Sequence, residues 1–365
     1  MQHSPVSDLE TPSLLIDRDI LQRNLSGMQT ALAGKGITLR PHAKTHKIPE
    51  IARLQVALGA VGITVATLGE AEVFAAAGID DVFIAYPLWM TPRSADRVRA
   101  VLASTRLSLG VDSAESAENT AALLGPDAAR VAVRIEVDSG HHRSGVRPED
   151  AATVALAARR AGLIVDGVFT FPGHSYAPGA AATVALDERD ALTAAAAALE
   201  PAGIPVAVRS GGSTPTALLT AAGTVTEARP GVYAFGDAQQ WELGRCAPED
   251  IAVSVLSTVV SAHERDGETF LVADAGSKIL GSDRPAWTTG YGRVLGAPDA
   301  RIVALSEHHA TIRWAERDRP PALGSRLRIV PNHVCLAMNL VDDAVVTAGD
   351  QVVDVWHVAA RGRNG

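Results

Sequence analysis

Short apolar runs alternate with longer amphipathic or alanine-rich segments along the first two thirds of the chain. The apolar runs are rich in β-branched residues and show no polar alternation, which is typical of strands buried on both faces of a parallel sheet. One such strand is predicted near the start of the chain, at 13–17. Eight more are predicted after it, at 37–41, 62–66, 82–86, 107–111, 131–137, 166–171, 206–210 and 224–228.

Helices are predicted in most of the intervals between these strands. They cover 18–34, 49–59, 69–77, 92–104, 114–124, 149–161 and 181–200, with a shorter and weaker segment at 213–222. Eight strand–helix units in roughly 215 residues predict a (β/α)8 TIM barrel, whose usual size is about 250 residues. The alternative is a doubly wound open sheet, which normally has a G-x-G-x-x-G turn after its first strand. Here that strand leads into RPHAKTHK, which contains no glycine, so we favour the barrel.

The pattern changes near residue 251. Long helical periods disappear, and short β-rich runs separated by Gly, Pro and Asp predict a C-terminal β domain. These runs lie at 252–263, 269–274, 300–305, 309–315, 326–331, 344–347 and 351–356. We expect a barrel over 18–240 and a β-rich domain made of 1–17 and 241–365, in which the early strand at 13–17 could take part.

Composition narrows the classes of protein that fit this pattern. The chain has 365 residues, 47% of them hydrophobic, which suits two domains with substantial cores. A net charge of -8 argues against a nucleic-acid surface, and two cysteines exclude a disulfide scaffold. No basic segment followed by an apolar one marks a secretory signal, and no apolar run is long enough to cross a membrane. We expect a cytoplasmic protein.

Lysine is scarce, which makes one lysine conspicuous. The chain contains only Lys35, Lys44, Lys47 and Lys278. Lys44 follows the first barrel strand directly, and the carboxyl ends of barrel strands form the substrate side of this fold. Arg40, His42, His46 and Lys47 surround it in the sequence, and cationic neighbours favour a nucleophilic lysine amine. The alternative is a basic loop ahead of a helix; we favour Lys44 as a Schiff-base lysine.

A glycine-rich segment follows the seventh barrel strand. It reads SGGSTPT from Ser210 to Thr216, and such glycines let backbone amides approach an anion. Barrels commonly bind phosphate in the loops after strands seven and eight, although most Gly-Ser loops are only turns. A lysine at the first strand and a phosphate loop at the seventh together indicate pyridoxal 5′-phosphate (PLP).

Four segments in order resemble one family. RPHAKTHK, SGGSTPT, RPGVYAFGD (229–237) and PNHVCLAMNL (331–340) are similar to segments of the alanine-racemase-type (fold type III) PLP enzymes. Within these they resemble the D-serine dehydratase and D-threonine aldolase branch, over essentially the whole chain. The resemblance implies a PLP-binding barrel, a C-terminal β domain and a head-to-tail homodimer.

The resemblance also implies roles for individual residues. Lys44 holds the cofactor as a Schiff base, Arg134 approaches the cofactor ring oxygen, and Tyr176 lies near the pyridine nitrogen. The cofactor phosphate is bound by Gly211, Gly212, Ser213 and Thr214. Other roles stay open for two of these residues: Arg134 could pair with Glu136 or Asp138, and Tyr176 could cap a loop.

His333 and Cys335 form a candidate metal pair. In an extended segment, residues i and i+2 project from the same face, and imidazole with thiolate favours zinc. Packing in the core is the alternative for two such residues on a strand. The resemblance implies a metal here that holds the β-hydroxyl of the substrate, with water and substrate completing the ligand set.

Taken together, these expectations describe a PLP- and zinc-dependent lyase. It would remove the β-hydroxyl of a D-β-hydroxy-amino acid, converting D-serine to pyruvate and ammonia. The alternative within the same branch is a D-threonine aldolase, which yields glycine and an aldehyde. The His-x-Cys pair favours the dehydratase, because aldolases of this branch more typically show His-x-Asp. A racemase would need a second acid/base that the sequence does not reveal, and a non-catalytic PLP carrier would need neither His333 nor Cys335.

Overall fold

The computed structural model describes residues 4–220, 222–315 and 319–365 of the chain. They form two compact units. The first, the barrel unit, contains Gly27–Lys44, Pro49–Gly231 and Arg363–Gly365. The second, the sheet unit, contains the residues up to Ser26, Thr45–Ile48 and Val232–Gly362. Each unit has its own sheet and its own candidate functional residues.

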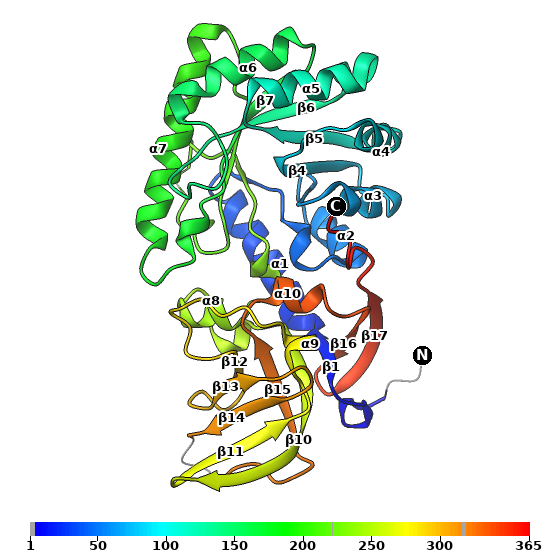
Figure 1. Ribbon diagram of the computed structural model, residues 1–365, viewed down its shortest axis with the longest axis vertical. Helices are drawn as coiled ribbons and strands as arrows, with labels where there is room; N and C mark the ends of the chain where they lie inside the picture. The colour runs from blue at the N-terminus through cyan, green and yellow to red at the C-terminus, as the bar shows by residue number, and fades with distance from the viewer. Residues whose placement is uncertain (1–3, 221, 316–318) are drawn as a thin grey trace. The chain divides into compact units, whose positions relative to one another are not determined.

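Eight parallel strands form the sheet of the barrel unit (Figure 1). In the order in which they pair, they are β2 (Thr38–Leu39), β9 (Glu227–Ala228), β8 (Val208–Gly211), β7 (Ile164–Phe169), β6 (Ala132–Glu136), β5 (Arg106–Val111), β4 (Asp81–Pro87) and β3 (Ile63–Val65). A parallel bridge between His42 and Thr64 links the segment after β2 to β3, at the opposite end of this order. The sheet therefore curls back on itself, which confirms the predicted barrel fold class.

Helices alternate with these strands along the chain. They are α1 (Arg18–Ala33), α2 (Pro49–Ala57), α3 (Leu68–Ala76), α4 (Pro92–Leu102), α5 (Ala114–Leu124), α6 (Ala151–Arg160) and α7 (Ala181–Leu199). The start of α4 shows why they form where they do: Thr91 accepts a hydrogen bond from the Ser94 amide at 3.1 Å, and Pro92 opens the helix. Within the described part of the chain, no helix is both long and apolar enough to span a bilayer.

The weaker helix predicted at 213–222 is absent from the described part of that segment. Residues 214–219 form hydrogen-bonded turns instead. The Ser213 amide donates to the Thr216 hydroxyl at 2.9 Å, and the Thr220 hydroxyl donates to the Thr216 carbonyl oxygen at 3.2 Å. Hydroxyl side chains that bond to nearby backbone compete with helix formation, so helical spacing misled the prediction here.

The sheet unit is built on a mostly antiparallel, nine-stranded sheet. Its strands are β1 (Ser13–Asp17), β10 (Val253–Arg265), β11 (Glu268–Ala273), β12 (Gly292–Val294), β13 (Arg301–Leu305), β14 (Ala310–Trp314), β15 (Arg326–Pro331), β16 (Asp343–Ala348) and β17 (Gln351–His357). Strand β1 pairs antiparallel with β10 and parallel with β16, so the early strand belongs to this sheet. Short helices accompany it: α8 (Ala238–Glu242), α9 (Ser277–Leu280) and α10 (Val334–Met338). Of the strands that the structure describes in this unit, β12 was not predicted from the sequence.

A network of buried charges lies in the barrel unit. Glu227 accepts hydrogen bonds from Arg40 Nε and Arg134 Nη1, each at 2.7 Å. The same arginines bind further carboxylates, Arg40 to Asp81 at 2.5 Å and Arg134 to Asp166 at 3.2 Å. Burial by itself raises the pKa of Glu227, but Arg40 and Arg134 lower it to about 2. Glu227 is therefore a permanent anion held between two cations.

Candidate active site

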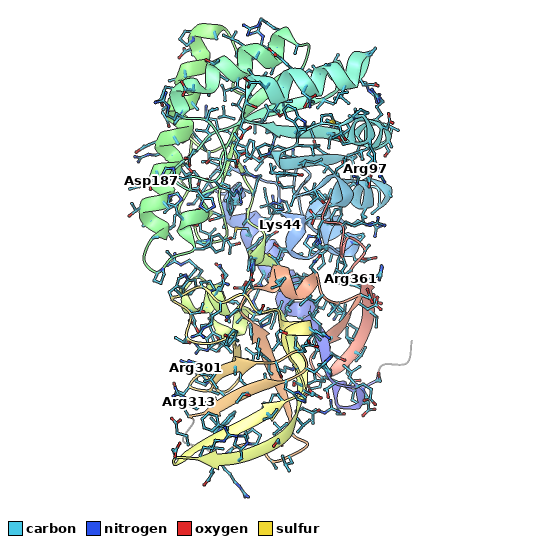
Figure 2. The ribbon with its side chains drawn as sticks, viewed as in Figure 1. Lys44, Arg97, Asp187, Arg301, Arg313 and Arg361 are labelled. Carbon is cyan, nitrogen blue, oxygen red and sulfur yellow. The ribbon has the colours of Figure 1, made fainter. Side chains whose placement is uncertain are left out.

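Lys44 lines a cavity of about 640 Å³ in the barrel unit. It lies in a short 3₁₀ turn, η2 (Ala43–Thr45), a few residues after β2. Its side chain is labelled in Figure 2. The side chain is half-buried, and its Nζ lies 5.7 Å from the centroid of the Phe171 ring. The cavity falls in the range of about 300–1,000 Å³ that small-molecule sites occupy. The structure thus places the predicted lysine at the wall of a pocket of suitable size.

Gly212 lines the same cavity, just after the end of β8 at Gly211. It adopts φ +77°, a left-handed conformation that favours glycine, and a Cβ there would lie 3.3 Å from the Ala228 Cβ. Its amide donates to Glu188 at 2.6 Å, and a Cβ on Gly211 would come within 2.5 Å of the same carboxylate. The left-handed backbone therefore favours glycine at 212, and a side chain at 211 would have to displace the Glu188 carboxylate.

Hydroxyl groups continue the loop after Gly212. Ser213 is buried, and its Oγ lies 2.9 Å from Ser175 Oγ and 3.0 Å from Thr216 Oγ1. Thr214, which follows, is half-buried at the beginning of the turns. A cluster of hydroxyls beside backbone in this conformation is suited to bind an anion.

Two arginines add positive charge to the cavity wall, Arg143 and Arg229. Arg229 is fixed by hydrogen bonds to Ser210 Oγ and the Thr170 carbonyl oxygen, both at 2.5 Å, and burial lowers its pKa to about 10. Arg143 is exposed, and its guanidinium lies 4.9 Å from the centroid of Phe171. Among the described residues no ion pair is formed by Arg143. Its charge is therefore available to an anionic ligand.

Of the residues predicted to contact the cofactor, Lys44 and Gly212 line this cavity, whereas the lining does not include Arg134, Tyr176, Gly211, Ser213 and Thr214. Arg134 is ion-paired with Asp166 and Glu227 instead, neither of which is the acidic partner considered from the sequence. Tyr176 is half-buried and follows the 3₁₀ turn η5 (Gly173–Ser175). Sequence analysis did not assign the two arginines of the cavity wall, Arg143 and Arg229, to the site. For Arg143, the available signal was its position after the end of β6, in SGHHRSG.

His333 and Cys335 lie in the sheet unit, where β15 gives way to α10. The expected extended segment is wrong: β15 ends at Pro331, His333 is extended (φ −129°, ψ 102°), and Cys335 is already in the first turn of α10. Asp237 helps to start this helix by accepting a hydrogen bond from the Val334 amide at 3.2 Å. The side chains of His333 and Cys335 nevertheless converge, and a hydrogen bond joins them.

Acidic groups surround the His333 imidazole. Its Nδ1 lies 2.8 Å from Asp283 Oδ2. Burial lowers the pKa of His333, but Cys335, Asp283 and Asp237 outweigh it and raise the pKa to about 11. These acidic groups favour a cation at this point, and a bound metal ion would have to displace the second proton of the imidazole, because a histidine ligand is neutral.

The protein donors at this point are an imidazole nitrogen and a cysteine sulfur. Within the residues that the structure describes, no three or more His, Cys, Asp and Glu side chains are arranged to hold a metal ion. Imidazole and thiolate suit zinc, and catalytic zinc sites leave positions open for water or substrate. The pair therefore fits a zinc ion whose remaining ligands come from outside the chain.

Both parts of the chain match known protein families. Residues 16–239 match the alanine racemase N-terminal domain, and residues 252–347 match the putative serine dehydratase domain. The chain is 38% identical to D-threo-3-hydroxyaspartate dehydratase of Delftia sp. strain HT23, with 95% of this chain and 97% of the relative covered. It is 33% identical to D-threonine aldolase of Arthrobacter sp., with 98% and 94% covered. Against D-serine dehydratase of Dictyostelium discoideum the identity is 31%, with 95% and 96% covered.

Solved structures agree with these matches. The Delftia dehydratase superposes with a TM-score of 0.87 at 35% identity, with 97% of this chain and 98% of that chain covered. That enzyme has also been solved with a histidine replaced by alanine, and, in a metal-free form, with a cysteine two positions further along replaced. Fold, cavity and matches together define a PLP-dependent lyase. The chain belongs to the alanine-racemase-type PLP enzymes, in the branch that contains these dehydratases and aldolases.

Proposed function

We propose that the protein is a PLP- and zinc-dependent lyase that eliminates the β-hydroxyl of a D-β-hydroxy-α-amino acid, converting D-serine to pyruvate and ammonia. The observation that carries this proposal is that Lys44 and Gly212 line one cavity in the barrel unit. The cavity walls supply groups that the cofactor needs: a lysine amine for its aldehyde, and Gly212 and two arginines for its anionic groups. The described residues thus fit PLP.

Lys44 has two tasks in this proposal. In the resting enzyme its Nζ would hold the aldehyde carbon of the cofactor. Bound PLP would supply the electron sink that makes the Cα proton of an amino acid acidic. Once the substrate amine has displaced it, the Lys44 amine would accept that proton at Nζ. The β-hydroxyl then departs, and hydrolysis of the released enamine gives the keto acid and ammonia.

The loop and the arginines would orient the ligands. Gly212 would let the phosphate approach the loop closely, and Arg143 would meet a carboxylate, because its guanidinium is exposed in the cavity. Arg229 is held rigidly by Ser210 and Thr170. It would provide fixed positive charge with no rearrangement when an anion binds.

His333 and Cys335 would hold the zinc ion. Zinc would supply a Lewis acid that stabilises the departing β-hydroxyl. The acidic surroundings of His333 support a cation there. The metal-free variant of the Delftia dehydratase, which lacks a cysteine with the same spacing from a histidine, also supports it.

Elimination is favoured over aldol cleavage on two grounds. The dehydratase of Delftia shares more identity with the chain, 38%, than the D-threonine aldolase of Arthrobacter does, at 33%. The pair is also His-x-Cys. A location in the cytoplasm and a homodimer, both expected from the sequence, stay predictions.

Product analysis tests the proposal. Purified protein with PLP and zinc would be incubated with D-serine, D-threonine and D-threo-3-hydroxyaspartate, with the L-enantiomers as controls. Ammonia with pyruvate, 2-oxobutyrate or oxaloacetate supports the dehydratase, and the preferred keto acid identifies the substrate. Glycine with an aldehyde would make the enzyme an aldolase. If none of the D-amino acids yields either set of products, both the dehydratase and the aldolase proposals are wrong.

A further inference from the structure

Asp283, which is distant from His333 in the sequence, binds the Nδ1 atom of the His333 ring. Asp283 Oδ2 lies 2.8 Å from His333 Nδ1. Asp283 lies in the loop between α9 and β12, 50 residues before His333. A carboxylate is an acceptor, so the shared proton belongs to Nδ1, and a metal bound at Nε2 would take the place of the second ring proton. The ring also forms a hydrogen bond with Cys335.

The position of Asp283 is fixed by more than this one contact. The Asn332 side-chain amide donates to the Asp283 carbonyl oxygen at 2.9 Å and to the Gly290 carbonyl oxygen at 2.8 Å. Asn332 is only 3% exposed and directly precedes His333 in the chain. Consecutive residues therefore bind the same loop, Asn332 through the loop's backbone and His333 through the carboxylate. Because these two contacts hold the loop, the Asp283 carboxylate is preorganised beside the His333 ring.

We propose that Asp283 is the positioning residue of the metal site. It fixes the tautomer and ring orientation of His333 so that Nε2, together with Cys335 Sγ, binds the divalent cation. Metal-binding histidines generally donate their other ring N–H to such a partner, whose removal costs about 10–100-fold in metal affinity. This inference rests on the metal site of the proposed function and assigns to it a residue outside the His-x-Cys pair.

Zinc affinity, measured without substrate, tests the inference. The PLP-loaded protein would be stripped of metal, and its affinity for zinc measured by competition with a chromophoric chelator. Asp283→Ala should bind zinc about 10–100-fold more weakly than the unchanged protein. Asp283→Asn should lose less, on the order of 10-fold, because its amide oxygen still accepts from Nδ1–H. The Asp283 side chain is 48% exposed, so both variants should fold.

The chain offers a matched control. Asp343 forms the same kind of pair with His357 Nδ1, at 3.0 Å, on β16 and β17. Asp343→Ala should leave zinc affinity unchanged. Zinc binding by both Asp283 variants as tight as that of the unchanged protein would overturn the inference and leave the proposed function intact. If the unchanged protein binds no zinc, or His333→Ala binds it equally well, the proposed metal site itself is wrong.

Discussion

The carboxylate of Glu188 accepts a hydrogen bond from the Gly212 amide at 2.6 Å, which joins α7 to the glycine loop that lines the cavity. Glu188 is 1% exposed, and its other oxygen has no hydrogen-bond partner among the described residues. Burial raises the pKa of this carboxyl to about 7, against a lowering by the Gly212 amide and Arg229. The loop is therefore held from behind by an acid that changes charge near neutral pH.

Glu188→Gln should alter how stability depends on pH. The native pKa of Glu188, about 7, exceeds the ordinary value of 4.5. Between these two pH values, the native state keeps a proton that the unfolded state releases. Glu188 therefore lowers the free energy of unfolding as pH rises from 4.5 to 7. The free energy of unfolding of Glu188→Gln, relative to that of the unchanged protein, should increase across this pH range by on the order of 2–3 kcal/mol. Urea unfolding of the cofactor-free proteins measures it.

Asp187→Asn is the control for this prediction. Asp187 precedes Glu188, and its side chain is 47% exposed. Its removal should leave the pH dependence close to that of the unchanged protein. Parallel stability curves for Glu188→Gln and the unchanged protein would show that Glu188 does not titrate in this window.

Lys44→Ala should abolish the visible absorbance that a PLP–lysine Schiff base gives near ~410–430 nm. Activity should fall on the order of 10²–10⁴-fold or more, since the variant also lacks the amine that accepts the Cα proton. Lys35→Ala is the matched control in the same unit, because the Lys35 amine donates to the Leu218 carbonyl oxygen at 2.5 Å and does not line the cavity. If Lys44→Ala keeps the band and Lys35→Ala loses it, the assignment of the Schiff-base lysine is wrong.

Gly212→Ala should weaken cofactor binding as well as the fold. An alanine at φ +77° costs about 1–2 kcal/mol in a left-handed conformation. Its methyl group would also stand 3.3 Å from the Ala228 Cβ in the loop that we propose binds phosphate. Gly179→Ala provides the comparison, because Gly179 has φ +75° and no atom lies within 4 Å of the place that an alanine methyl group would take. Both variants should lose similar stability, and only Gly212→Ala should raise the Kd for PLP.

Cys335→Ala should abolish zinc binding, whereas Cys246→Ala should preserve it. Burial raises the pKa of the Cys246 thiol to about 12, so it stays protonated and is a poor metal ligand. Chelation should remove the activity of the unchanged protein, and added zinc should restore it. Full activity after chelation, with zinc absent by elemental analysis, would argue against any role for the metal in turnover.

The fold was largely predictable, because most barrel strands are apolar β-branched runs next to helices with clear starts such as Thr91-Pro92. The exceptions have local causes. At Ser213–Thr216, hydroxyl groups bond to nearby backbone and replace the expected helix with turns. At His333, Asp237 accepts from the Val334 amide and α10 begins where a strand was expected. Such side-chain contacts with backbone leave almost no mark on hydrophobic periodicity.

The candidate site was predictable only in part. Lys44 and the glycine loop carry signals in their residue types and in their places after strands. The sequence carries no such signal for Asp283, because its contact with His333, 50 residues away, depends on tertiary structure. Arg143 was not predicted, although its position after a barrel strand was an available signal.

The alternating charges around Glu227 restrict which substitutions this sequence can accept during evolution. Arg40 and Arg134 each bridge Glu227 to a further aspartate, Asp81 or Asp166. Replacing any one member would strand an opposite charge in a buried place, at a cost of about 3–5 kcal/mol. Viable change at these positions should therefore come in compensating pairs, and relatives that lack one of the two arginines should also have lost an acid beside it. In an alignment of such relatives, the positions of this charge network should show correlated substitutions.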